Sequence, residues 1–296
     1  MRVFLTGATG FIGSAIVQEL LSSGHEVLGL ARSDAAADAL SRLSVQAHRA
    51  ELADTAGLAA AARACDGVIH TAFIHDFSAH AAAAETDRQA VAAMLGALEG
   101  SGKPLVATSV TVLLAHAHPA TEDMPVPEAS PNPRAKAEAM VLAAAGRGVR
   151  ASVVRLPPSV HGAGDYGFVP MLVRIARSKG VAAFIGEGAN LWPAVHRLDA
   201  ARLFRLALES ALPGARLHAV AEKGLPLRAI AEAIGEGLGV PARGIAADEA
   251  PAHFDWLARF VAIDNPTSSA LTRSALGWQP REAELLADMR DSGYFS

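Results

Sequence analysis

A glycine-rich turn within the first thirteen residues constrains the fold more than any other feature of this chain. The apolar run at 2–6 predicts a β-strand, and the stretch that begins at Phe11 predicts a helix. Between them, Gly7 permits a tight turn, Gly10 lets backbone N–H groups approach a pyrophosphate, and Gly13 lets the helix pack closely on the strand. The start of the helix carries the positive end of its dipole, which favours bound phosphate. The turn therefore predicts a dinucleotide-binding crossover.

The rest of the first half alternates short apolar runs with longer alanine-rich stretches, which is the pattern of parallel strands joined by helices. Several apolar runs are hydrophobic on both faces, as strands covered by helices on both sides must be. Strands are expected near 2–6, 26–31, 45–49, 67–72, 104–109 and 150–156, and helices near 11–23, 34–43, 55–64, 79–99 and 132–146. We therefore predict an α/β fold with a doubly wound parallel sheet, a Rossmann domain spanning residues 1–156.

Beyond that domain the regular alternation weakens. Glycine-spaced loops at 162–167 and 186–190 are typical of segments that cover a site. Residues 157–296 are expected to form a smaller substrate-capping region, from which a segment at about 195–221 returns to the Rossmann body.

Composition restricts the partners of the chain. Its 296 residues include 26 Lys and Arg against 30 Asp and Glu, for a formal net charge of -4. Because binding to a phosphate backbone needs a basic face, nucleic acid is not expected as a partner. No apolar run reaches the roughly 18 residues that span a bilayer, so no membrane partner is expected. The single cysteine excludes an intrachain disulfide framework and suits a cytoplasmic protein, which we expect to be a monomer or homodimer with a small-molecule substrate.

The end of the second predicted strand bears on the choice between NAD and NADP. A site that prefers NAD usually places an acidic residue there to hold the adenosine ribose hydroxyls. This chain has Arg32 and Ser33 instead. Because a guanidinium pairs with a 2'-phosphate and a hydroxyl adds a donor, the sequence favours NADP over NAD.

Further motifs resemble the short-chain dehydrogenase/reductase superfamily, in its extended and atypical branch, which is NAD-dependent epimerase/dehydratase-like. They lie at residues 6–13, 66–72, 106–109, 155–158 and 195–201, together with Lys136. The turn and the resemblance together imply a cofactor-binding set of Gly7, Thr9, Gly10, Phe11, Ile12, Gly13, Arg32, Ser33, Leu52, Ala72, Phe73, Lys136 and Pro157. The resemblance also implies that Ser109 orients the substrate oxygen and that Lys136 holds the nicotinamide ribose.

One position departs from the family's pattern. The family's Tyr-x-x-x-Lys places a phenol and an ammonium on one helix face, where the cation lowers the pKa of the phenol. Residues 132–136 read N-P-R-A-K, so Asn132 occupies the tyrosine position. An amide donates a hydrogen bond to an oxyanion, but it gives up no proton near neutral pH.

Three residues are candidates for the missing proton donor. Tyr166 and His161 lie in or next to the glycine-spaced loop that is expected to overhang the site, and His75 follows the fourth strand. A loop aromatic or histidine also commonly shapes a pocket wall, which is the alternative for each of them. Tyr294 lies close to the C-terminus, where fraying is expected. The predicted catalytic set is Ser109, Asn132, Lys136 and Tyr166.

Other residue groups suggest less specific roles. His70, His75, His80, His116 and His118 invite a metal interpretation, but no carboxylate pattern or H-E-x-x-H accompanies them, and no metal is predicted. The apolar residues Phe168, Met171, Phe184 and Trp192 either line a substrate cavity or pack in the core.

We therefore predict an NADP(H)-dependent oxidoreductase that reduces a carbonyl or similar electrophile on a small, fairly apolar molecule, with a non-standard proton donor. Two alternatives come from other classes. The lost tyrosine suits a non-catalytic NADP(H)-binding redox sensor. A sugar-nucleotide epimerase or dehydratase is less favoured, because the capping region has little clustering of basic residues for a diphosphate.

Overall fold

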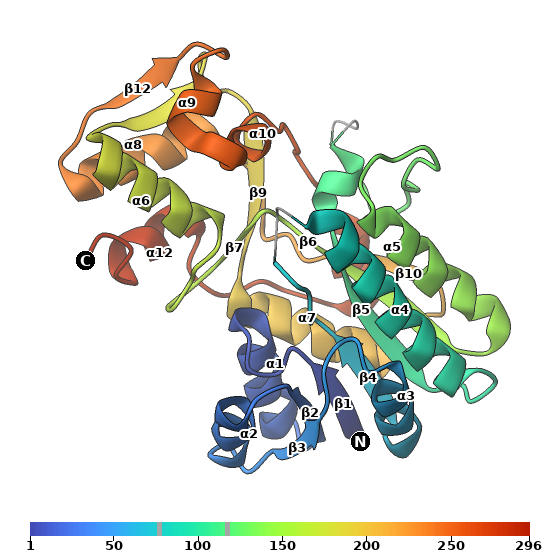
Figure 1. Cartoon of the computed structure of the whole chain (residues 1–296). Helices are drawn as coiled ribbons and strands as arrows, with labels where there is room; N and C mark the ends of the chain where they lie inside the picture. The colour runs from blue at the N-terminus through green and yellow to red at the C-terminus, as the bar shows by residue number, and fades with distance from the viewer. Residues whose placement is uncertain (76–78, 116–118) are drawn as a thin grey trace.

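A seven-stranded parallel sheet forms the centre of the molecule (Figure 1), in a computed structural model that describes residues 1–75, 79–115 and 119–296. Its strand order is β10-β6-β5-β4-β1-β2-β3, and every neighbouring pair is parallel. The strands are β1 (Arg2–Thr6), β2 (Glu26–Ala31), β3 (Gln46–Arg49), β4 (Gly67–His70), β5 (Pro104–Val110), β6 (Arg150–Leu156) and β10 (Ala215–His218). The chain runs from β1 to β2 and β3 on one side, then crosses back to β4 on the other side of β1 and continues outward to β5 and β6. The prediction of a doubly wound α/β fold is confirmed.

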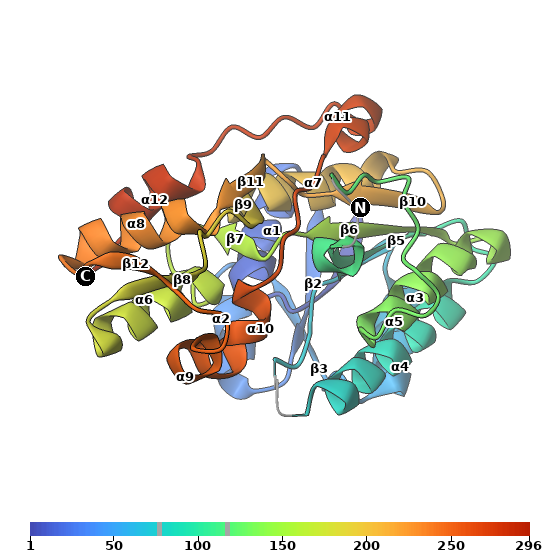
Figure 2. The ribbon, with the colours of Figure 1, turned by 90° about the horizontal axis from the view of Figure 1, so that it is seen from above.

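Helices cover both faces of this sheet, because alternate strand residues point to opposite sides. In β1, Val3 and Leu5 belong to one core cluster and Phe4 to another. The first cluster lies under α1 (Phe11–Ser22), α2 (Asp34–Ser41) and α7 (Arg197–Ser210), and the second under α3 (Thr55–Ala64), α4 (His80–Leu98) and α5 (Arg134–Ala143). Seen from above, α1 and α7 lie on one side of the sheet and α3, α4 and α5 on the other (Figure 2). Within the described part of the chain, no helix is both long and apolar enough to cross a membrane.

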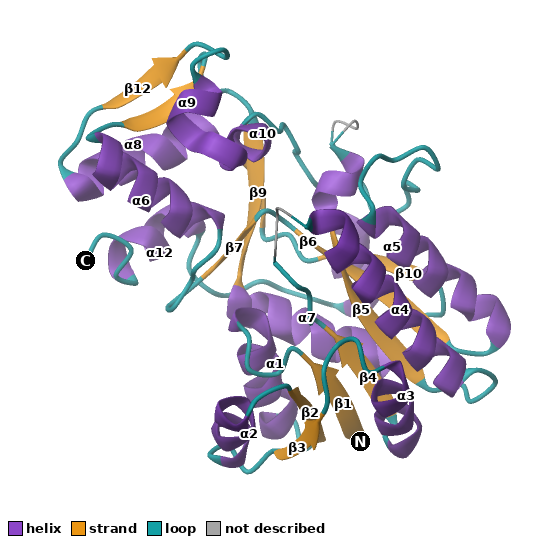
Figure 3. Ribbon diagram, in the orientation of Figure 1, coloured by secondary structure: helices purple, strands orange, loops and turns teal. Residues whose placement is uncertain are grey.

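The capping region contains two further sheets and its own core (Figure 3). The three-stranded sheet has the order β11-β9-β7, and the two-stranded sheet pairs β12 with β8. Its elements are β7 (Ser159–His161), α6 (Phe168–Lys179), β8 (Ala182–Ile185), β9 (Leu191–His196), β11 (Glu222–Pro226), α8 (Leu227–Leu238), β12 (Ala242–Ile245), α9 (Ala250–Phe254), α10 (Ala258–Val261) and α12 (Leu285–Asp291). Trp192 and Phe184 are buried in this core, and Phe168 and Met171 pack against it, which is the core alternative of the sequence analysis.

Two later segments lie against the Rossmann body. Strand β10 extends the large sheet beside β6. Further on, Asn265 accepts a hydrogen bond from the Thr111 hydroxyl at 2.7 Å, and the indole N–H of Trp278 donates to the Asp199 carbonyl at 3.0 Å. The remaining short elements are α11 (Ala270–Leu276) and the 3-10 turns η1 (Thr111–Leu114), η2 (Ala144–Arg147) and η3 (Asp255–Leu257).

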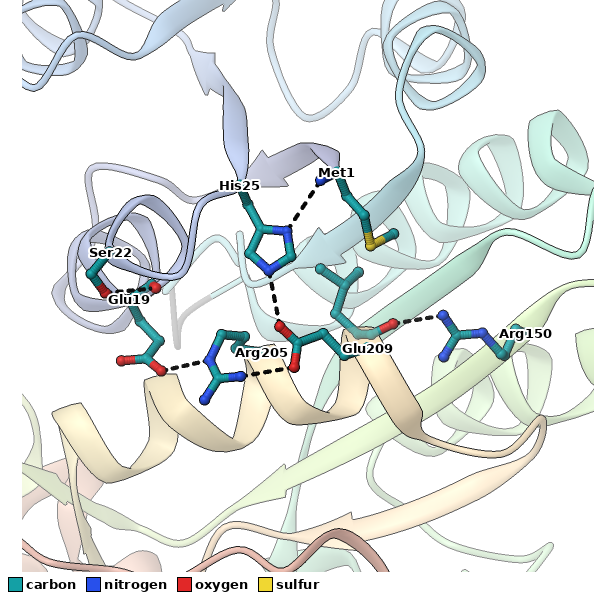
Figure 4. A network of polar contacts seen from close by, with 8 residues as sticks. Met1, Glu19, Ser22, His25, Arg150, Arg205 and Glu209 are labelled. Carbon is teal, nitrogen blue, oxygen red and sulfur yellow. Dashed lines mark hydrogen bonds and ion pairs between the residues drawn. The ribbon is translucent and has the colours of Figure 1, made fainter.

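A polar network ties α1 to α7 (Figure 4). Arg205 of α7 binds Glu19 of α1 at 2.7 Å and Glu209 at 2.8 Å. The other carboxylate oxygen of Glu209 lies 2.9 Å from His25 Nε2, and His25 Nδ1 lies 3.4 Å from the amino group of Met1. The helix that begins at the glycine turn is thereby held against the helix that returns from the capping region.

Candidate functional site

Apart from Lys136, the predicted cofactor residues follow strands of the large sheet at one edge. Because its strands are parallel, their carboxyl ends meet at the same edge. The glycine turn follows β1, Arg32 follows β2, Ala72 and Phe73 follow β4, and Pro157 follows β6. β1 and β4 are neighbours although the chain leaves them in opposite directions, and open α/β sheets bind ligands at such a switch point.

The glycine turn itself is shaped for close approach. Gly7 has a positive φ of 72°, and a Cβ there would lie 2.8 Å from the Ala72 nitrogen. A Cβ at Gly13 would lie 1.9 Å from the Gly7 carbonyl oxygen. Helix α1 starts after Gly10 with no side-chain cap and no acidic residue in its first turn. Its first amides can therefore donate to an anion, so the turn fits a dinucleotide pyrophosphate.

Thr6 binds the loop that follows β4 and holds it beside the glycine turn. Its hydroxyl oxygen accepts hydrogen bonds from the backbone N–H groups of Thr71 and Ala72, each at 3.2 Å. The same oxygen lies 2.7 Å from His70 Nδ1, and His70 Nε2 lies 3.0 Å from Asp87. All three side chains are buried, so the chain of contacts fixes the backbone that faces the glycine turn.

The histidines singled out in the sequence do not form a metal centre in the described part of the chain. Both ring nitrogens of His70 are engaged by Thr6 and Asp87. Among the described residues, no group of three or more potential ligands lies close enough to hold an ion. His116 and His118 lie outside the described residues.

Arg32, which the sequence analysis assigns to the 2'-phosphate of the cofactor, is exposed directly after β2. The Ser33 hydroxyl caps α2 by accepting a hydrogen bond from the Ala36 N–H at 3.2 Å, which leaves its own proton to donate. The sequence analysis missed Arg49, which the register of β2 and β3 places opposite Ala31. Arg49 pairs with Asp34 at 2.7 Å. The sequence indicates Arg49 by its position at the end of the third predicted strand, which pairs with the second strand in a sheet of this kind.

Of the predicted catalytic residues, Ser109 lies on β5, Asn132 just before α5 and Lys136 on α5, while Tyr166 lies on the loop before α6. The hydroxyl of Ser109 is buried and donates to Glu138, which also pairs with buried Arg155 at 2.5 Å. The side-chain oxygen of Asn132 accepts from the Arg134 backbone N–H at 3.1 Å, just before α5 begins. Lys136 is exposed on α5. Hydrogen bonds from Arg88 and Gln89 lower the pKa of Glu85 on α4 to about 2, and the charge of Lys136 contributes to this shift.

The three candidate proton donors lie in different places. Tyr166 is 61% exposed, and its hydroxyl oxygen accepts a hydrogen bond from the Phe11 N–H at 3.4 Å, so it stands over the start of α1. His161 is buried against Asp288, 2.7 Å away, and burial lowers its pKa. His75 lies beside Phe73, with ring centroids 5.4 Å apart. Burial, followed by the charge of Arg134, lowers its pKa too.

Tyr294 is not frayed as the sequence analysis expected. Its hydroxyl donates to Asp165 Oδ2 at 2.8 Å and accepts from the Gly162 N–H at 3.3 Å. The other Asp165 oxygen accepts from the Gly167 N–H at 2.6 Å. These bonds outweigh terminal freedom and dock the C-terminal residues on the loop that carries Tyr166. Burial raises the pKa of Asp165 from its ordinary 3.8 to about 6.

This raised pKa predicts a pH-dependent stability. Because folding favours the protonated carboxyl, Asp165 contributes stability that is present below about pH 4 and lost as the pH rises through 6. The melting temperature of the wild type should therefore fall, relative to Asp165→Asn, between pH 4 and pH 7. Thermal melts of the two proteins across this range check the prediction, and parallel curves would contradict it.

Arg134 is the residue at this edge that the sequence analysis left unassigned. Its Nη2 donates to the Thr108 carbonyl at 3.3 Å, and its guanidinium carbon lies 4.4 Å from the centre of the Phe73 ring. The sequence signal was an arginine two residues after the missing tyrosine, in a position that the family pattern treats as variable.

Comparison with known proteins identifies the family. The family model of the NAD dependent epimerase/dehydratase family matches residues 3–218. An uncharacterised protein of Schizosaccharomyces pombe is 49% identical over the full length of both chains. A 2-alkyl-3-oxoalkanoate reductase of Stenotrophomonas maltophilia is 30% identical over 81% of this chain and 77% of its own. A dTDP-glucose 4,6-dehydratase from Streptomyces venezuelae, solved with NAD, matches 100% of this chain and 96% of its own with a TM-score of 0.80 and 20% identity.

The predicted resemblance to the extended branch of the superfamily is thus confirmed. The family and two relatives named as reductases support an NAD(P)-dependent enzyme of the oxidoreductase type. The chain belongs to the NAD dependent epimerase/dehydratase family.

Proposed function

We propose that this protein is an NADP(H)-dependent reductase of a carbonyl or similar electrophile on a small, fairly apolar molecule. The observation that carries the proposal is the glycine turn, where a Cβ at Gly7 or Gly13 would collide with backbone beside the uncapped start of α1. The reductase from Stenotrophomonas, whose name specifies an oxoalkanoate, supports reduction of a carbonyl. The similarity to the sugar-nucleotide dehydratase, at 20% identity, is a similarity of fold.

The residues of the sheet edge fit the cofactor. The amides at the start of α1 would hold the pyrophosphate. Arg32 and Ser33 would hold the 2'-phosphate, and the Ala72 backbone would lie beside the cofactor at the end of β4. When bound, NADPH supplies a hydride for a carbonyl carbon. Tyr166 and Arg197 both lie beside Phe11 at this start: the Tyr166 ring centroid is 5.9 Å and the Arg197 guanidinium carbon 5.1 Å from the centre of the Phe11 ring.

Asn132 and Ser109 contribute hydrogen bonds near the substrate oxygen in this proposal. The amide nitrogen of Asn132 stays a donor while its oxygen caps α5. The single proton of the Ser109 hydroxyl is directed to Glu138, so this serine must turn away from Glu138 before it can donate to a substrate. The final proton comes from water or from a loop side chain. Of the three side chains considered, His75 is the one beside Phe73 and Arg134.

Turnover decides between the reductase and its alternatives. We expect purified protein to oxidise NADPH in the presence of at least one class among ketones, aldehydes and enones. Asn132→Tyr should raise that rate, because a phenol four residues before Lys136 restores a proton donor. NADPH binding without consumption of any compound would favour the redox sensor. Conversion of a nucleotide sugar without net NADPH oxidation would favour the epimerase or dehydratase.

Arg32 tests the proposed preference for NADP. Arg32→Ala should weaken NADPH binding about tenfold or more while changing NADH binding little, because one charge-assisted contact to the 2'-phosphate is lost. Calorimetric titration with both coenzymes measures the effect. Arg42→Ala is the control, since Arg42 is an exposed arginine at the other end of α2. Equal losses for both coenzymes would show that Arg32 does not read the 2'-phosphate.

A further inference from the structure

Arg134 is a fixed cation at the same sheet edge as the glycine turn. Helix α5 begins at Arg134, whose side chain reaches back to the carboxyl end of β5 and donates to the Thr108 carbonyl at 3.3 Å. Its guanidinium stacks over Phe73, which follows β4. Contacts with two neighbouring strand ends hold the charged group in place.

This cation has no anionic partner among the described residues. Asp87 and Glu138 are the acidic groups that act on it electrostatically, but each has another partner. Asp87 contacts His70 at 3.0 Å, and Glu138 pairs with Arg155. None of the ion pairs between described residues includes Arg134, and its Nε and Nη1 donate to no described residue. Burial lowers the pKa of its guanidinium, against the smaller opposing effects of Asp87 and Glu138.

A second arginine acts on the same region from the capping side. His80, in the first turn of α4, has its pKa lowered by burial and then by the charges of Arg134 and Arg259. Arg259 belongs to α10 of the capping region, so this positive field receives contributions from both parts of the molecule. Figure 1 shows α10 on the side of the capping region that faces α4 and α5. An oxyanion bound at Arg134 would supply the missing counter-charge.

We propose that Arg134 binds a carboxylate of the substrate, so that the carbonyl compound reduced by this protein is an oxo acid. The proposal rests on the reductase function given above. A guanidinium has a planar fork of N–H groups that matches the two oxygens of a carboxylate. One N–H of Arg134 is used by Thr108, and the remaining ones are available for such a pair. A single held arginine suits a monoanion, whereas a nucleotide diphosphate calls for several cations.

A matched pair of substrates tests the proposal. We expect the wild type to reduce acetoacetate with a KM at least about tenfold below that of its methyl ester. Arg134→Gln should raise the KM for acetoacetate about tenfold or more and leave that for the ester nearly unchanged. Arg134→Lys should fall between them, because it retains the charge without the fork. Arg147→Gln is the control, since Arg147 is an exposed arginine beyond the far end of α5.

Calorimetry separates this proposal from the reductase function. The reduced product 3-hydroxybutanoate is titrated into each protein with NADPH present, where no hydride transfer occurs, and its methyl ester and methyl phosphate serve as comparisons. We expect the wild type and Arg147→Gln to bind the hydroxy acid better than the ester, Arg134→Lys to do so to a smaller extent, and Arg134→Gln not to discriminate, while all variants bind NADPH equally and are thereby shown to be folded. If no carbonyl compound is reduced but this pattern holds, the reductase function fails and the anion site stands. Equal binding of acid and ester by the wild type, equal losses for both in Arg134→Gln, or tighter binding of methyl phosphate would overturn the carboxylate assignment.

Discussion

Replacing Gly13 with alanine is expected to abolish measurable NADP(H) binding and to lower the melting temperature strongly. The added Cβ would lie 1.9 Å from the Gly7 carbonyl oxygen and 3.1 Å from the Ala8 Cα, which are both backbone atoms. Overpacked cores usually relax at a cost of about 1–3 kcal/mol, but here the helix must move away from the strand that positions the turn. We expect at least a hundredfold loss of affinity by calorimetry, on the order of 3 kcal/mol, together with loss of the thermal shift that NADPH produces.

Gly96 provides the matched control for this substitution. It lies within α4, and a Cβ there would meet nothing within 4 Å. Gly96→Ala should bind NADP(H) like the wild type and be more stable by up to about 1 kcal/mol, because alanine favours helices. If Gly13→Ala retained wild-type affinity, the glycine turn would not be the pyrophosphate site and the proposed function would lose its main support.

Removing the carboxylate of Glu138 is expected to destabilise the fold by about 3–5 kcal/mol, because it leaves the charge of Arg155 buried without its partner. Arg155 and Glu138 are both buried and 2.5 Å apart, and Ser109 donates to the same carboxylate. Urea unfolding of Glu138→Ala measures the loss as a lower midpoint at constant slope.

Two comparisons isolate the effect of burial in this pair. Glu85 forms an exposed pair with Arg88 on α4, and Glu85→Ala should leave the unfolding midpoint almost unchanged. The double variant Glu138→Leu/Arg155→Met should recover part of the loss, since apolar residues of similar volume often replace a buried pair at no net cost. Equal effects at Glu85 and Glu138 would mean that the Arg155 charge is compensated by other groups.

The Rossmann part was predictable because its signals are local. The turn, the alternation of strands and helices, and the order of the motifs are all properties of neighbouring residues. The errors occur at element ends, where tertiary contacts decide. Strand β4 ends at His70 rather than at 72, because Thr71 and Ala72 turn to bond Thr6. Helix α5 begins at Arg134 rather than at 132, since the Asn132 side-chain oxygen accepts from the Arg134 N–H and Pro133 is the N-cap.

The capping region was less predictable, because its order depends on contacts between distant residues. Its short strands pair across long stretches of chain, and the sequence analysis expected a loop at 186–190 without the strands on either side. The acidic and proline-rich composition of residues 119–133, just before the Rossmann domain's last helix, predicts a surface loop. Yet Glu122 in this stretch is buried and accepts hydrogen bonds from both the N–H and the hydroxyl of Thr272, 150 residues away.

The candidate site was predictable in position but not in side-chain direction. Sequence patterns placed the end of the fifth strand and the start of the following helix beside the cofactor turn. They did not reveal that Ser109 is bound to Glu138, that Lys136 is exposed, or that Arg134 reaches Thr108. Which side of a helix start faces the sheet depends on how the helix is docked, and that in turn depends on buried groups elsewhere.

The docking of Tyr294 on the Asp165 loop has a practical consequence for anyone handling this protein. That loop also carries the side chain whose hydroxyl meets the first amide of α1. A purification tag fused after Ser296, or a deletion of residues 294–296, is therefore expected to change the coenzyme affinity that we propose for the start of α1, and kinetic work is better begun with the tag removed.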